Sequence, residues 1–129
     1  MADNSGGLRT PLGQVRFLGA ARNGTGEAWL MHVTSLALIP LSLYFVWLML
    51  DLLHMDYNGV RAELGRPLPA VLLLAFILSG VLHMELGMRS IIIDYVEGRS
   101  RAWALLANTL FAALLALACA YATLRISFT

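Results

Sequence analysis

Residues 28–50 read AWLMHVTSLALIPLSLYFVWLML, a run of 23 residues without a charged side chain. A helix of this length crosses the roughly 30 Å hydrocarbon core of a bilayer. A second apolar run covers residues 68–93 and holds three ionisable side chains, and a third, residues 102–124, holds none. Because backbone amides in lipid must be satisfied within their own segment, each run should form a helix. We therefore predict an all-α membrane protein with three transmembrane helices.

The composition of the chain also indicates a membrane protein. Of the 129 residues, 59% are hydrophobic and 13% are charged, and the mean hydropathy is +0.72. A soluble fold of this size has too much surface to cover with so few charges. All nine basic residues are arginines, set against eight acidic residues, so the net charge is close to zero. These numbers exclude a soluble monomer, a nucleic-acid-binding protein with a basic patch and a disordered chain.

The arginines predict the orientation of the chain. The polar segment 1–27 and the short loop between the second and third runs carry five arginines, and with three spans these regions share one side. The opposite side carries three, namely Arg61, Arg66 and Arg125. Since positive residues concentrate on the cytoplasmic side, we predict a cytoplasmic N-terminal segment, residues 1–27, and a membrane-anchor domain, residues 28–129.

A polar stripe runs along the second span. At 100° per residue, one face carries His83, Asp94, two serines and two glycines. Small residues of this kind let another helix or a flat cofactor approach the backbone closely. Ionisable groups are costly in lipid, at roughly 2.5–3.5 kcal/mol each near the bilayer centre. The stripe is therefore expected to face protein.

His83 is expected near the middle of the membrane, about 16 Å along the helix from Asp94 at the cytoplasmic boundary. Three roles are open to it: a hydrogen bond across a helix interface, a step in a proton relay, or an axial ligand of haem, for which imidazole is a standard choice. His32 is expected roughly 6 Å below the same boundary, at a different depth. His54 lies in the first loop. A bis-histidine haem would thus need a ligand from another subunit.

Other polar residues also have two interpretations. Glu85 and Arg89 are spaced i, i+4 with the acid first, the favourable order for an ion pair that neutralises itself or docks a partner helix. Tyr95 is either an ordinary interfacial tyrosine or a phenol that donates a hydrogen bond to a ligand carbonyl. In the second case Asp94 is its orienting or proton-handling neighbour. Pro40, inside the first run, is expected to kink its helix.

The string His83 to Tyr95, HMELGMRSIIIDY, resembles the signature of the small hydrophobic cytochrome b membrane-anchor subunit of succinate dehydrogenase, respiratory complex II. In that family the second helix reads His-x3-Gly-x6-Asp-Tyr, and this chain matches each position. The similarity in layout covers essentially the whole chain. The N-terminal stretch adds further similar residues: Arg9-Thr-Pro-Leu-Gly13, Arg22-Asn-Gly24, Trp29 and Val33-Thr34.

The resemblance implies a role for each of three residues. His83 would ligate the iron of a haem b shared with a second, larger cytochrome b anchor subunit, which supplies the other histidine. Tyr95 would donate a hydrogen bond to a carbonyl oxygen of ubiquinone, and Asp94 would belong to the same quinone site. Family members commonly carry an arginine at the position of His32. A histidine there would neutralise haem propionates or line the quinone site more weakly and with pH dependence.

We therefore expect an anchor subunit of succinate:ubiquinone oxidoreductase within a heteromeric helix bundle. Its partners would be the second cytochrome b anchor, an iron–sulfur subunit and a flavoprotein subunit, through which electrons arrive from succinate. The chain alone would hold no catalytic residue. The lack of an arginine-rich presequence favours a bacterial inner membrane. The alternatives are a fumarate reductase anchor, a small proton-coupled transporter or channel subunit with His83, Glu85 and Asp94 as relay groups, and a non-catalytic assembly scaffold.

Overall fold

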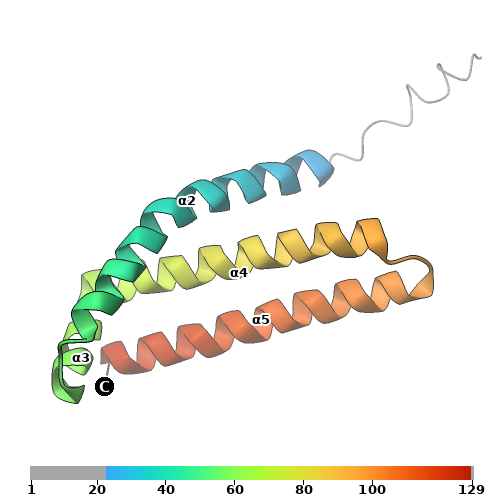
Figure 1. The fold of residues 1–129 in the computed structure, drawn as a ribbon. Helices are drawn as coiled ribbons and strands as arrows, with labels where there is room; N and C mark the ends of the chain where they lie inside the picture. Colours follow the sequence, from blue (N-terminus) through green and yellow to red (C-terminus); the bar gives the residue numbers. More distant parts are fainter. Residues whose placement is uncertain (1–22, 129) are drawn as a thin grey trace, which may run out of the picture.

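The computed structural model describes residues 23–128 of the chain. They form four helices: α2 Asn23–Leu52, α3 Tyr57–Leu64, α4 Pro67–Tyr95 and α5 Arg99–Phe128 (Figure 1). Three of these, α2, α4 and α5, are long and apolar enough to cross a membrane. The prediction of an all-α protein with three spanning helices is confirmed, and each helix runs past its expected span. Most of the expected N-terminal segment lies outside the described residues.

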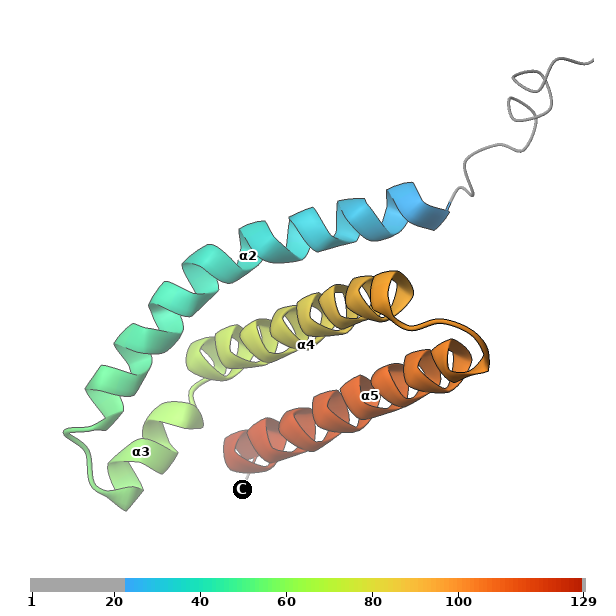
Figure 2. The same cartoon turned by 45° about the vertical axis from the view of Figure 1, so that its right-hand side comes forward.

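The helix α4 is central among the three long helices. It packs against α2 on one side and α5 on the other, so the three form a row rather than a closed bundle (Figures 1 and 2). The short α3 lies where α2 passes into α4, and it contacts both α4 and α5. The connection between α4 and α5 lies at the opposite end of the row.

Local signals in the sequence set the ends of the helices. Asp56 caps α3, because its Oδ1 accepts a hydrogen bond from the backbone N–H of Gly59 at 3.0 Å. Pro67 begins α4, at a position where a backbone N–H would have no partner within the helix. Gly98 has a φ of +70°, a left-handed conformation that suits glycine and reverses the chain before α5.

The helix α2 bends along its length (Figures 1 and 2). Pro40 lies inside this helix and lacks the N–H that would bond to the carbonyl of Leu36, in line with the kink expected there. Beyond the proline, Phe45 stacks on Phe76 of α4, with ring centroids 4.7 Å apart. Leu48, one turn further on, is fully buried. These contacts fix α2 against α4 in the half of the helix that leads to α3.

Little apolar surface is buried within the chain. The hydrophobic side chains that are buried among the described residues are Leu48, Leu86, Ile92 and Ala112. Large apolar side chains remain exposed along all three long helices, and Trp29 is one of them at 71%. Surface of this extent requires lipid or partner helices to cover it. A membrane protein that works inside a larger assembly would have such a surface.

Candidate functional site

His83 lies on the side of α4 that packs against α2. Its Nδ1 is 3.2 Å from Thr34 Oγ1 and 3.4 Å from Ser35 Oγ. Thr34 also donates to the backbone carbonyls of Leu30 and Met31, at 2.9 and 3.0 Å. Ser35 donates to the carbonyl of Met31 at 2.8 Å. Since each hydroxyl has a single proton, both hydroxyls act as acceptors toward the imidazole.

This hydroxyl pair favours Nδ1–H as the donor of the His83 ring. With its proton on Nδ1, an imidazole carries its lone pair on Nε2. Within residues 23–128, no hydrogen bond reaches Nε2. Histidines that ligate metals are held in this way, through a hydrogen bond from the other ring nitrogen. The interhelical hydrogen bond expected as one role of His83 is thus present, and it leaves the ring able to act as a ligand.

His32 and His83 are not brought together. His32 is exposed, and its Nδ1 is 2.6 Å from the carbonyl oxygen of Ala28 in the same helix. The expected difference in depth is wrong, because α2 begins at Asn23 and Thr34, only two residues after His32, contacts His83. His32 is separated from His83 by its direction. It lies two residues before Thr34, and two residues turn a helix by about 200°, so His32 projects from a different side of α2. No cluster of three or more potential metal ligands exists among the described residues.

Asp94 and Tyr95 lie at the C-terminal end of α4. Both side chains are exposed, Tyr95 at 82%. In the part of the chain that the structure describes, neither side chain forms a hydrogen bond or an ion pair. The helical rise places them about 16–18 Å from His83 along the axis. A phenol and a carboxylate are therefore available together to a ligand or a partner at this end of the helix.

The polar stripe of α4 is only partly covered by protein. A Cβ on Gly80 would meet Leu38 of α2 at 3.9 Å, and His83 contacts the same helix. Further along, a Cβ on Gly87 would have nothing within 4 Å, and the exposed Ser90 donates to a carbonyl of its own helix. The expectation that the stripe faces protein holds within this chain only for its first part. The part that leads to the end of α4 is open.

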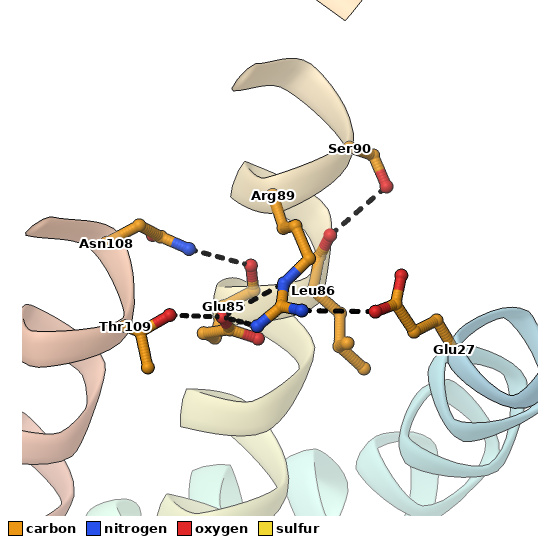
Figure 3. A network of polar contacts seen from close by, with 7 residues as sticks. All are labelled: Glu27, Glu85, Leu86, Arg89, Ser90, Asn108 and Thr109. Carbon is orange, nitrogen blue, oxygen red and sulfur yellow. Dashed lines mark hydrogen bonds and ion pairs between the residues drawn. The ribbon is translucent and has the colours of Figure 1, made fainter. Parts of the chain in front are cut away.

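Glu85 and Arg89 form the expected ion pair and also join three helices (Figure 3). Arg89 donates to Glu85 Oε1 from Nη2 at 2.6 Å and from Nε at 3.2 Å, and it donates to Glu27 of α2 from Nη1 at 3.1 Å. On α5, Thr109 donates to the same Oε1 at 3.1 Å. Asn108 donates to the backbone carbonyl of Glu85 at 3.0 Å. Three donors from two side chains thus converge on Oε1 of the buried carboxylate.

The sequence did not identify Glu27, Asn108 and Thr109 as parts of this network. The signal for the last two was their position as adjacent polar residues in an otherwise apolar stretch of the third span. Glu85 faces α5 whereas His83 faces α2, so these two groups are not brought together. The relay that a proton-coupled transporter would need is therefore not assembled between them in this chain.

Comparisons with known proteins place the chain among membrane subunits. The family described as succinate dehydrogenase/fumarate reductase transmembrane subunit matches residues 7–116. The succinate dehydrogenase hydrophobic membrane anchor subunit of Paracoccus denitrificans is 31% identical over 116 residues, which is 90% of each chain. The proteins of the same name from Rickettsia bellii and Rickettsia felis are 28% and 34% identical, over 70% and 60% of this chain and 72% and 65% of theirs.

No solved structure matches the chain. The family match includes residues 83–95, which carry the His-x3-Gly-x6-Asp-Tyr pattern. Membership implies association with the other subunits of the enzyme complex. The chain therefore belongs to the family of succinate dehydrogenase and fumarate reductase transmembrane subunits, as a membrane-anchor subunit of succinate dehydrogenase.

Proposed function

We propose that this anchor subunit supplies one axial ligand of haem b and part of a ubiquinone site, in a bacterial inner membrane. The bacterial relatives named as membrane anchors support this location. The other subunits would be a second, larger cytochrome b anchor, an iron–sulfur protein and a flavoprotein. Electrons from succinate would pass through the last two, and the anchor would position ubiquinone to receive them.

The hydrogen bonding of His83 is the observation that carries the haem proposal. Thr34 and Ser35 lie against Nδ1, and with the proton on that nitrogen Nε2 would keep its lone pair free to ligate iron. Because His32 points in another direction, the second axial imidazole would come from the partner anchor. Haem b supplies a one-electron redox centre when it is bound. A role of the exposed His32 beside the haem propionates remains a prediction.

Tyr95 and Asp94 support a quinone site by their position and their lack of partners. The phenol is available to donate a hydrogen bond to a quinone carbonyl, where negative charge develops as the quinone is reduced. Asp94, the adjacent residue at the same helix end, is placed to hold or transfer a proton. The chain would thus orient the substrate and handle protons, while the reducing electrons come from other subunits.

The proposal is tested on the purified complex with His83→Ala and Tyr95→Phe. We expect His83→Ala to abolish the reducible b-type absorption bands while the flavoprotein and iron–sulfur subunits still co-purify. Tyr95→Phe should keep the bands and slow quinone reduction. If both variants match the wild type, the chain is a scaffold. If the wild type has no b-type bands, the haem proposal is wrong. Comparing succinate oxidation with fumarate reduction identifies the preferred direction.

A further inference from the structure

The short connection between α4 and α5 is held through the backbone carbonyl of each of its residues, 96–98. Arg101 Nε donates a hydrogen bond to the carbonyl oxygen of Val96 at 2.7 Å. Ser100 Oγ donates to the carbonyl oxygen of Glu97 at 2.7 Å. The backbone N–H of Arg101 donates to the carbonyl oxygen of Gly98 at 3.4 Å. All three donors belong to the first turn of α5, which therefore fixes the course of the connection (Figure 2).

The side-chain bond of Arg101 holds the peptide that directly follows Tyr95. Val96 leaves the helix in an extended conformation, with φ −103° and ψ 123°, while its N–H still donates to the carbonyl of Ile92 at 2.9 Å. Its own carbonyl lies past the end of α4, where no N–H of that helix reaches it. A guanidinium is a favourable partner there, because a helix C-terminus carries partial negative charge. Arg101 and Val96 are both half-buried, so water only partly competes for this bond.

We propose that Arg101 is a positioning residue for the quinone site, an inference that rests on the function proposed above for Tyr95. The phenol forms no hydrogen bond within residues 23–128, so the backbone on either side of Tyr95 determines where it points. The last turn of α4 fixes the backbone before it, and the bond from Arg101 to Val96 fixes the backbone after it. A donor stabilises the charge that develops on a quinone carbonyl only when it is held in the productive direction. Arg101 would act through Tyr95, without touching the quinone.

Arg99 provides a matched comparison in the same turn of α5. It is exposed, and its side chain forms no hydrogen bond or ion pair within the described part of the chain. Replacing either arginine removes one positive charge from the same end of the row. Only the replacement of Arg101 removes the bond to Val96. The two positions therefore separate the hydrogen bond from the charge and from any effect on membrane orientation.

The test measures kcat/KM for ubiquinone in the purified complex. Arg101→Met keeps an unbranched side chain and removes the bond, so this value should fall about fivefold, as far as Tyr95→Phe lowers it. Arg101→Gln has an amide N–H in place of Nε–H and should stay near the wild-type value. Arg101→Lys keeps the charge but has a methylene at the position of Nε, and it should fall as Arg101→Met does. Arg99→Met should equal the wild type.

Two further measurements separate positioning from a general structural effect. Succinate oxidation with a soluble artificial acceptor, which takes electrons before they reach the quinone site, should be the same in every variant. In a Tyr95→Phe background, Arg101→Met should cause no further loss, because both changes remove the same hydrogen bond to the quinone.

The inference is overturned if the losses from Arg101→Met and Tyr95→Phe multiply, or if activity with the artificial acceptor falls in Arg101→Met. A loss in Arg101→Gln or in Arg99→Met as large as that in Arg101→Met also overturns it. Wild-type kinetics in Arg101→Met beside a slowed Tyr95→Phe would overturn this inference alone. Wild-type kinetics in Tyr95→Phe would overturn the proposed quinone site and this inference with it.

Discussion

Two hydroxyl groups on α2 contact Nδ1 of His83 and leave Nε2 without a hydrogen bond within residues 23–128. Replacing Thr34 by Val and Ser35 by Ala removes both acceptors of the Nδ1–H and leaves side chains of similar size. We expect haem to be held about tenfold more weakly, because the hydrogen bond that orients a ligating histidine is lost. The reduction potential of the haem should also shift. The ratio of haem to protein and a potentiometric titration measure these two effects.

Controls for this variant come from nearby hydroxyls. The single variant Thr34→Ser keeps a hydroxyl acceptor, so its haem content and its haem reduction potential should equal those of the wild type. Ser90→Ala removes a hydroxyl that bonds to its own helix, and it should change neither property. A wild-type potential and full haem content in the double variant would show that the hydroxyls do not orient His83. Loss of haem in His83→Ala would still support the ligand itself.

Tyr95 is the residue whose loss should affect the quinone and not the haem. Tyr95→Phe removes one hydroxyl from an exposed side chain, so the fold should be undisturbed. The loss of a hydrogen bond of about 1 kcal/mol should reduce kcat/KM for ubiquinone about fivefold. Steady-state rates at varied ubiquinone concentration give this value, and Tyr44→Phe is the matched control. Equal loss in both variants would argue against a specific role for Tyr95.

At the level of helices, the Glu85 network joins α4 to both neighbours. Glu85→Gln removes the negative charge of the side chain to which Arg89 and Thr109 both donate hydrogen bonds. We expect the free energy of unfolding to fall by roughly 1.5–3 kcal/mol, which is the usual contribution of a hydrogen bond in which one partner is charged. Thermal unfolding in detergent measures it, with the exposed Glu97→Gln as control. Equal melting temperatures for the two variants would contradict a stabilising role.

The sequence predicted the three long helices because an uncharged run in lipid has few other ways to satisfy its backbone. It did not predict the start of α2, since glycines at positions 24 and 26 disfavour a helix by propensity alone. That error placed His32 and His83 at different depths. The relative height of two helices depends on contacts such as Phe45 with Phe76, which hydropathy does not encode.

The candidate site was predicted in part. The i, i+4 spacing of Glu85 and Arg89 was sufficient to predict their ion pair, because one helix holds both residues. The partners Asn108 and Thr109 were missed, because they lie on another helix. The roles open to His83 could be narrowed only after the two hydroxyls of α2 were located. Local geometry can be read from spacing, whereas contacts between helices require the fold.

At the scale of the whole molecule, the orientation in the membrane is a prediction that follows from five arginines against three. A single cysteine placed at Asn58 or at Ser100, both exposed, tests it in a Cys119→Ala background. In spheroplasts, an impermeant maleimide should label the Asn58→Cys variant. It should label the Ser100→Cys variant only after permeabilisation. The reverse pattern would show that the N-terminal segment lies outside the cytoplasm.

The three-residue connection between α4 and α5 has a consequence for biogenesis. Residues 96–98, with Gly98 in its left-handed turn, leave no room for the two helices to separate widely as the chain leaves the ribosome. Asn108 and Thr109 satisfy Glu85 only when the helices lie together. We therefore expect α4 and α5 to enter the bilayer as one hairpin, with Glu85 already paired. Arg99 and Arg101, in the first turn of α5, would remain on the side of synthesis.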